Sequence, residues 1–217
     1  MLKPSVADLE ALLRESTVLP VLRAVSASEA MTQVALCAAA GLDVIELTTS
    51  TPDWPAALRD AIAAFPDKTV GLGTVLDASD AATAVSLGAG FVVSPCPTPD
   101  VRRVAGEAGV AMIEGGMTIG EVLDASGRGI AKLFPAGVVG QAFLRSLLQV
   151  RPAARVIPTG GIALDDVAEW IHAGALAVGV GRELFANPDL TTTITEIKTR
   201  AAGFATPTSS IIFCRWP

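Results

Sequence analysis

Short apolar runs alternate with amphipathic segments along most of the chain. Eight of these runs are too short and too rich in β-branched residues to be helices, and each is typical of a strand buried on both faces. They lie at residues 18–22, 43–47, 69–72, 91–93, 110–113, 130–134, 155–157 and 177–180. Strands that alternate with helices favour right-handed crossovers and a parallel sheet. Eight of them favour closure, so the pattern predicts an α/β fold, a (β/α)8 TIM barrel.

The segments between these runs begin and end with helix signals. Ser26 or Ser28 is placed to cap the helix after the first strand, and Thr118 with Glu121 three residues later forms a capping-box pattern. Helical segments also run into glycines that can take the left-handed turn back to the next strand, at Gly41, Gly88, Gly109 and Gly174. An amphipathic segment at about residues 5–15 predicts an additional N-terminal helix that plugs or flanks the bottom of the barrel.

The alternation continues without a linker or a composition shift as far as residue 204. We therefore expect residues 1–204 to form a single (β/α)8 domain. The last stretch, residues 205–217, is apolar without a helical period, and we expect an irregular C-terminal tail there.

Composition and charge exclude several classes of protein. The net charge of −6 argues against nucleic acid as a partner, because nucleic-acid binding favours a basic stripe. The N-terminal segment lacks the apolar core of a signal peptide, and no apolar stretch is long enough to span a bilayer. Cys37, Cys96 and Cys214 are widely spaced without a CxxC pair, which favours reduced thiols over a disulfide framework. We expect a cytoplasmic protein with no membrane partner.

Lys132 stands inside an apolar strand, near the end where barrels carry their chemistry. Strand alternation places Ile130, Lys132 and Phe134 on one face. A buried ammonium loses its hydration, which favours the neutral amine. The neutral amine is the form that attacks a ketone to give an imine. The alternative is a lysine that snorkels at an outer edge, but the apolar, central strand favours a nucleophile.

Glu46 is the second candidate for catalysis. Val44, Glu46 and Thr48 share a face at the end of the second strand, so the carboxylate can point into the same cavity as Lys132. Imine chemistry needs a group that moves protons during dehydration, bond cleavage and hydrolysis. The alternative is a structural ion pair with the lysine.

Two glycine-rich turns follow the last two strands, Thr159-Gly160-Gly161 and Gly179-Val180-Gly181-Arg182. Barrels often bind phosphate between these two loops, at the N-terminus of a following helix. Glycines let backbone N–H groups approach an anion, and the guanidinium of Arg182 adds a charged fork. Taken alone, each turn is as consistent with glycines that simply end a strand as with a phosphate site. Together they predict a phosphate site.

Three further residues end strands at the same rim. Thr74 and Pro95 end strands three and four, where they either line the pocket or form structural turns. Arg23 ends strand one and either binds a substrate carboxylate or phosphate or bridges to an acidic neighbour. The one histidine, His172, lies away from the rim, and no acidic cluster has ligand spacing. We expect no metal and no organic cofactor.

Several motifs together resemble the family of 2-keto-3-deoxy-6-phosphogluconate (KDPG) and 4-hydroxy-2-oxoglutarate (KHG) aldolases over residues 9–201. They are Glu46-Leu47-Thr48, Gly71-Leu72-Gly73-Thr74, Ser94-Pro95, Lys132-Leu133-Phe134-Pro135 and Pro158-Thr159-Gly160-Gly161. The resemblance implies a class I aldolase in which Lys132 forms an imine and Glu46 moves protons through a water. It further implies a homotrimer, a phosphate bound by the glycine turns, and a pyruvyl pocket lined by Thr74, Pro95, Phe134 and Thr159.

The chain departs from the family pattern at three positions. Where the family carries an arginine two residues after the strand-two threonine, this chain has Ser50, and it thereby resembles a branch that acts on the 6-phosphogalactonate analogue and has a short polar residue there. Arg23 is placed to supply the missing charge. Glu114 replaces a proline after strand five, at the rim beside the expected anionic substrate, and Arg182 replaces a serine. These changes leave the imine chemistry intact and bear on the choice of substrate.

Three functions are consistent with these residues. The first is a Schiff-base aldolase that cleaves a KDPG-like acid to pyruvate and glyceraldehyde 3-phosphate. The second keeps the lysine and changes the keto acid to 4-hydroxy-2-oxoglutarate or to the 6-phosphogalactonate analogue. The third is a phosphate-binding barrel without aldolase activity, which the fold alone permits. The third leaves the buried Lys132 without a role, so we predict the first.

Overall fold

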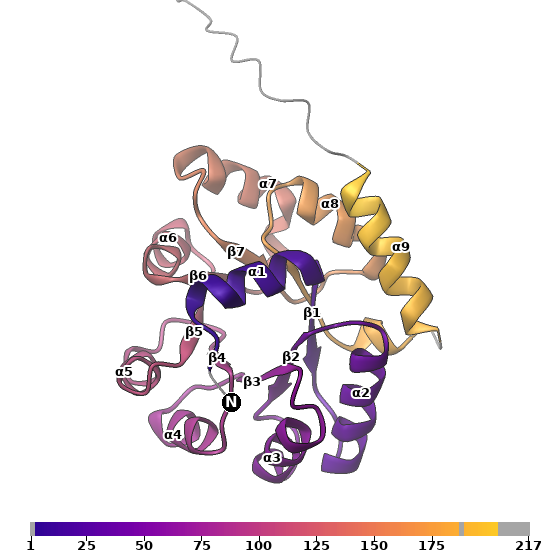
Figure 1. Ribbon diagram of the computed structural model, residues 1–217. Helices are drawn as coiled ribbons and strands as arrows, with labels where there is room; N and C mark the ends of the chain where they lie inside the picture. The colour runs from indigo at the N-terminus through magenta and orange to yellow at the C-terminus, as the bar shows by residue number, and fades with distance from the viewer. Residues whose placement is uncertain (1–2, 187–188, 204–217) are drawn as a thin grey trace, which may run out of the picture.

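Eight parallel strands form a nearly closed barrel in the computed structural model, which describes residues 3–186 and 189–203 (Figure 1). The strands are β1 (Val18–Leu22), β2 (Val44–Thr48), β3 (Thr69–Gly73), β4 (Phe91–Val93), β5 (Ala111–Gly116), β6 (Ile130–Leu133), β7 (Val156–Pro158) and β8 (Val178–Val180). They pair in the order β7-β6-β5-β4-β3-β2-β1-β8, and a bridge between Thr159 and Gly179 joins β7 to β8. The predicted (β/α)8 barrel is confirmed, and every strand overlaps its predicted run.

Helices surround the strands (Figure 1). They are α1 (Val6–Ser16), α2 (Ala27–Ala39), α3 (Trp54–Ala64), α4 (Ala78–Ser86), α5 (Pro99–Glu107), α6 (Ile119–Arg128), α7 (Ala136–Val150), α8 (Val167–His172) and α9 (Leu190–Ala202), with short 3-10 turns η1 (Leu164–Asp166) and η2 (Arg182–Phe185). Ser26 caps α2, and Thr118 with Glu121 forms the predicted capping box of α6. The four glycines predicted to turn the chain back all have positive φ.

Helix α1 closes the bottom of the barrel. Ser5 caps it in a capping box with Asp8, so the helix begins where the sequence predicts. Figure 1 shows α1 lying across the ring of strands. Leu9 and Leu13 on its inner side are fully buried and belong to the cluster of apolar side chains inside the barrel. Each of these leucines contributes about 1.5–3 kcal/mol by its burial. The additional helix therefore plugs the barrel.

The barrel interior changes character from bottom to top. Its apolar cluster includes Leu19, Phe91, Ile130 and Ile157. Two residues farther along β6 the inward position is Lys132, whose partner on β5 in the strand register is Gly115. The same alternation that fills the lower barrel with apolar side chains therefore brings polar ones to the C-terminal end of the strands.

Two further predictions concern the C-terminal tail and membrane-spanning segments. The irregular tail expected at residues 205–217 lies outside the described residues. Among the helices that the structure describes, none combines the length and the apolar character needed to cross a bilayer.

Candidate active site

Lys132 and Glu46 meet inside the barrel at the C-terminal end of the strands. The Nζ atom of Lys132 donates to Oε1 of Glu46 at 3.3 Å. The lysine side chain is 4% exposed and the glutamate side chain is fully buried. Within the described part of the chain, the second carboxylate oxygen, Oε2, has no hydrogen-bond partner. An amine and a carboxylate are thus in contact, with one carboxylate oxygen left to take or give a proton.

Phe134 and Gly73 shape the space around this pair. The Lys132 Nζ atom lies 5.8 Å from the centre of the Phe134 ring. A Cβ atom on Gly73 would overlap the Glu46 carboxylate. Only glycine at position 73 leaves room for this carboxylate, so β3 is built around Glu46.

Thr74 follows Gly73 in a strained conformation. Its φ is 61°, in the left-handed region that threonine avoids at a cost of order 1 kcal/mol. Its carbonyl accepts a hydrogen bond from the Thr49 hydroxyl at 3.0 Å, which holds the turn in place. Strain of this kind gathers at functional sites, and the structure thus brings the predicted pocket residue Thr74 next to the Glu46 position.

A cavity of about 240 Å³ opens at the same end of the barrel. Seven of the predicted site residues line it, namely Arg23, Phe134, Thr159, Gly160, Gly161, Gly181 and Arg182. The two glycine turns come together there because β7 and β8 are neighbours across the Thr159–Gly179 bridge. Gly160 has a φ of 91° and packs on the Phe134 ring, so the turn lies close to the lysine strand. The cavity thus extends from the predicted phosphate site to Phe134, the residue whose ring lies 5.8 Å from Lys132 Nζ.

Arg23 and Ser50 lie together on this rim. The Arg23 guanidinium donates to the Ser50 hydroxyl at 3.4 Å. Ser50 also shares a 2.8 Å hydrogen bond with Thr48, whose own hydroxyl donates to the Leu22 carbonyl. Since the Thr48 hydrogen is used, Ser50 donates to Thr48 and keeps its lone pairs for Arg23. The arginine predicted to replace the charge missing at position 50 is therefore held at that position.

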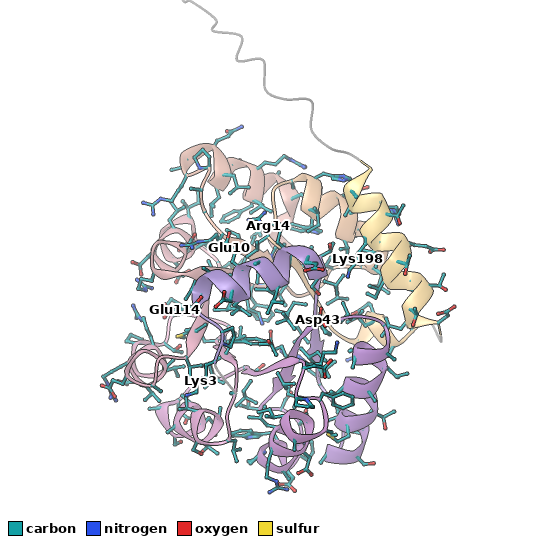
Figure 2. All side chains as sticks on the ribbon, in the orientation of Figure 1. Lys3, Glu10, Arg14, Asp43, Glu114 and Lys198 are labelled. Carbon is teal, nitrogen blue, oxygen red and sulfur yellow. The ribbon has the colours of Figure 1, made fainter. Side chains whose placement is uncertain are left out.

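Glu114 does not face the substrate, and the expectation that it stands at the rim beside an anion is wrong. Strand β5 continues to Gly116, so alternation turns Glu114 away from the barrel interior. Figure 2 labels Glu114 beside α5 and α6. Arg128 of α6 donates to its Oε2 at 2.6 Å, and Arg102 of α5 lies 3.6 Å from its Oε1. The carboxylate is buried and neutralised on the outer side of the sheet.

Pro95 reaches the site from the loop after β4. This residue is half-buried, and its backbone passes so close to Gly115 that a Cβ atom there would overlap it. Because Gly115 is the register partner of Lys132, the loop lies at the level of the lysine. All predicted site residues therefore lie at one end of the barrel; seven line the cavity, and Thr74 and Pro95 lie beside the Lys132–Glu46 pair through Gly73 and Gly115.

The sequence reasoning missed the two glycines that make room at this end. Gly73 and Gly115 occupy inward positions of β3 and β5, level with the catalytic candidates. A glycine inside a strand signals a close approach of another group, and this signal was present in both strands. Which group approaches depends on the strand order, which the local pattern does not carry.

Metal ligands were not expected. Within residues 3–186 and 189–203, no group of three or more His, Cys, Asp or Glu side chains is arranged to hold a metal ion. His172 lies on α8, and its Nε2 atom is 3.2 Å from the Ala201 carbonyl of α9. The histidine therefore connects two helices on the outside of the barrel.

Comparisons with known proteins find an aldolase family and individual aldolases that match most of this chain. The model of the KDPG and KHG aldolase family matches residues 9–196. A 2-dehydro-3-deoxy-phosphogluconate aldolase of Pseudomonas aeruginosa is 33% identical over 173 residues, which are 78% of this chain and 79% of the relative. A 2-dehydro-3-deoxy-6-phosphogalactonate aldolase of Escherichia coli is 29% identical over 169 residues, 76% of this chain and 82% of the relative.

A solved structure matches in three dimensions. It is the KDPG aldolase of Legionella pneumophila with pyruvate captured at low pH as a covalent carbinolamine intermediate. Its TM-score is 0.73 at 28% sequence identity, and the match covers 89% of this chain and 96% of that one.

Proposed function

The chain belongs to the family of KDPG and KHG aldolases, and from this premise we propose its substrate and its mechanism. As an aldolase it is a carbon–carbon lyase, and a barrel without aldolase activity is not favoured. The proposed reaction is cleavage of a 2-keto-3-deoxy-6-phospho sugar acid to pyruvate and glyceraldehyde 3-phosphate. The observation that carries this proposal is the buried contact of Lys132 with Glu46 at the same end of the barrel as a cavity lined by two glycine turns and by Phe134, whose ring lies 5.8 Å from the lysine.

The first half of the reaction builds an electron sink. The neutral Lys132 amine attacks the C2 carbonyl carbon, and the carbinolamine loses water to become an iminium ion. Glu46, 3.3 Å from the amine, takes the proton from nitrogen and returns one to the departing hydroxyl. The Legionella relative was captured with pyruvate at the carbinolamine stage of this sequence.

The second half breaks the carbon–carbon bond. A base removes the proton of the C4 hydroxyl, the C3–C4 bonding pair moves into the iminium, and an aldehyde and an enamine result. The enamine is then protonated at C3, and water hydrolyses the pyruvyl imine to pyruvate and free Lys132. Glu46 is the proposed proton carrier, since its Oε2 atom is buried without a partner among the described residues.

The substrate's two anionic ends have different proposed partners. The phosphate binds backbone N–H groups at Gly160, Gly161 and Gly181 and the guanidinium of Arg182, which all line the cavity. Arg23, held by Ser50, binds the carboxylate at the other end. Thr74, Pro95, Phe134 and Thr159 enclose the pyruvyl part.

A second candidate substrate is the 6-phosphogalactonate analogue of KDPG. It is favoured by the Arg23–Ser50 contact, because a serine there sets this chain apart from the arginine of the wider family. A relative of that name is 29% identical. The two acids are epimers at C4, so initial cleavage rates of the two, measured side by side, separate the candidates.

Arg182→Ser tests the proposed phosphate site. Loss of a charge-assisted hydrogen bond raises KM for the phosphorylated acid by about tenfold and leaves KM for the unphosphorylated acid unchanged. Arg59→Ser, at an exposed arginine paired with Asp60 on α3, is the matched control and leaves both values unchanged. Equal effects of Arg182→Ser on the two substrates contradict the phosphate role.

The proposal extends to assembly, location and cofactors. We propose a cytoplasmic homotrimer that works through the Lys132 imine without a metal or an organic cofactor. The family resemblance supports the trimer, and exposed apolar side chains such as Val138 and Ile119 offer surface of the kind that subunits bury. Light scattering tests the assembly, with three copies of the 22.2 kDa chain as the expected mass. Activity that survives chelators tests the absence of a metal.

A further inference from the structure

The loop between β4 and α5, residues 94–98, forms the wall of the site next to the lysine strand. Pro95 lies over Gly115, and Gly115 is the register partner of Lys132. A shift of this loop therefore moves the surface against which the lysine side chain and any group bonded to it must fit. Its position is set by a small number of contacts.

Ser94 fastens the start of the loop. Its hydroxyl donates to the Cys96 carbonyl at 2.8 Å and accepts the Gly115 N–H at 3.4 Å. The Ser94 N–H itself donates to the Ile113 carbonyl at 3.1 Å, as a continuation of the strand pairing. These bonds fix residues 94–96 to β5 on the inner side.

Glu114 fastens the end of the loop from the outer side of the same strand. The Thr98 backbone N–H donates to Glu114 Oε1 at 3.0 Å, and both residues are buried. Arg128 binds the other oxygen at 2.6 Å, and Arg102 lies 3.6 Å from the first. The adjacent residues Glu114 and Gly115 thus hold the loop together, one by a hydrogen bond and one by leaving space.

The groups bound to Glu114 differ in exposure, and this difference determines which of them loses most when the carboxylate is removed. Arg102 and Arg128 are each about one third exposed, so water can solvate their guanidinium groups when the carboxylate is absent. The Thr98 N–H is buried, and an unsatisfied buried donor costs about 1–3 kcal/mol. Removal of Glu114 therefore acts on the loop more than on the two arginines.

We propose that Glu114 is a positioning residue for the lyase reaction, which holds the 94–98 loop, and with it Pro95, against the Lys132 site. The two arginines neutralise the carboxylate and let it stay buried as an acceptor for Thr98. This inference rests on the proposed function, because the place of Pro95 in the pyruvyl pocket belongs to that proposal.

Donor-acid selectivity separates positioning from plain stability. The readout is the rate at which borohydride traps an adduct with pyruvate relative to 2-oxobutanoate, which carries one more methylene. A loss of stability lowers both rates in proportion to the folded fraction and leaves their ratio unchanged. A displaced Pro95 widens the pocket, so the ratio falls.

Three variants carry the test. Glu114→Ala removes the acceptor for Thr98 and is expected to lower the pyruvate preference by about tenfold. Glu114→Gln keeps an acceptor oxygen and should stay within about threefold of wild type. Asp124→Asn is the matched control, since Asp124 is the other carboxylate bound to Arg128 and its ion pair in the described structure is with that arginine and not with the loop, so it should leave the ratio unchanged.

The outcomes are distinct. A wild-type protein that gives no adduct with pyruvate overturns the proposed function, and the inference with it. A folded Glu114→Ala variant with the wild-type ratio overturns the inference alone, and so does an Asp124→Asn variant with an equal loss. If Glu114→Ala fails to fold, Glu114→Asp replaces it, because the shorter side chain keeps the charge and gives up the reach to Thr98. The same fall in ratio supports the inference, and an unchanged ratio rejects it.

Discussion

The lower and upper halves of the barrel interior are built by the same alternation and do different work. In the lower half, inward positions carry side chains such as Phe91 and Ile130, and the α1 leucines Leu9 and Leu13 fill the remaining space. In the upper half, inward positions of β2 and β6, which face each other across the barrel, carry Glu46 and Lys132, with glycines on the strands beside them. The buried apolar side chains of the lower half stabilise the fold, whereas the glycines of the upper half leave room for the polar side chains of the proposed reaction.

The two lysines at opposite ends of the barrel sharpen the difference. Lys68, just before β3 at the lower end, donates to Asp43 at 2.6 Å, and this hydrogen bond raises the pKa of Lys68. Lys68 therefore stays charged at neutral pH and serves as an ion-pair partner. Lys132 is enclosed among apolar walls and a single carboxylate oxygen at hydrogen-bond distance. Under the proposed mechanism, position in the barrel separates Lys68, a structural lysine, from Lys132, the proposed nucleophile.

The largest expected effect of a change in the upper half belongs to Glu46→Gln. The amide keeps the size of the side chain and an acceptor for Lys132, but it transfers no proton, so kcat for cleavage should fall by about 10²–10⁴-fold. Steady-state kinetics on protein whose fold is checked by circular dichroism gives the answer. Glu107→Gln is the control, because Glu107 is exposed and pairs with Arg103 on α5. A kcat within threefold of wild type would show that Glu46 is a structural ion-pair partner.

The converse change in the lower half is Leu13→Ala. Truncating a fully buried leucine of the α1 plug should lower the free energy of unfolding by about 2–5 kcal/mol and leave kcat per folded molecule unchanged. Urea unfolding and kcat at 25 °C are measured on the same preparation. Leu36→Ala, at a partly exposed position of α2, should shift stability by less than about 0.5 kcal/mol. A large fall in kcat for Leu13→Ala would break the division between the halves.

Gly73→Ala tests whether the upper half needs empty inward positions. The added methyl overlaps the Glu46 carboxylate, so unfolding free energy should fall by about 1–3 kcal/mol and kcat by about tenfold. Gly106→Ala is the control, because nothing lies near a Cβ atom at that helical position, and it should gain about 0.5–1 kcal/mol of stability at unchanged kcat. Two variants with equal kcat would mean that Glu46 can move without consequence.

The smallest expected effect concerns the alkylation of two thiols, Cys96 at the rim and Cys37, which is buried on α2. Burial raises the pKa of the Cys37 thiol to about 12, so at pH 8 it is almost wholly protonated, whereas Cys96 is exposed on the rim. Iodoacetamide at pH 8 should therefore label Cys96 and spare Cys37, with no effect on the fold. Peptide mass mapping checks this and resolves Cys214, which lies outside the described residues. Equal labelling of Cys37 and Cys96 in the folded protein would contradict the packing of α2.

Most of the barrel could be predicted from the sequence because its signals are local. Apolar runs of three to five residues, capping residues such as Thr118 with Glu121, and glycines after helices are each signals carried by a few consecutive residues. The inward direction of Lys132 also follows from simple alternation inside one strand. The pairing with Glu46 follows once the strands are known to close, since both residues then face one interior.

The direction of Glu114 was not predictable in the same way. Its orientation depends on how far β5 extends, and the strand continues to Gly116, beyond the predicted end at residue 113. Pairing of β5 with β6 up to Leu133 supports this extension, and that pairing is a tertiary interaction. The contacts of Gly73 and Gly115 are likewise set by neighbouring strands. Local pattern therefore located the site, and strand extension and register decided which residues enter it.

Trapping of the imine tests the proposed role of Lys132. The protein is incubated with pyruvate and borohydride, and the intact mass is measured for wild type, Lys132→Ala and, as a control with a lysine lost from the lower end of the barrel, Lys68→Ala. The proposed mechanism predicts one reduced pyruvyl group on wild type and on Lys68→Ala and none on Lys132→Ala. Wild-type protein without an adduct, or an adduct that persists in Lys132→Ala, would contradict it.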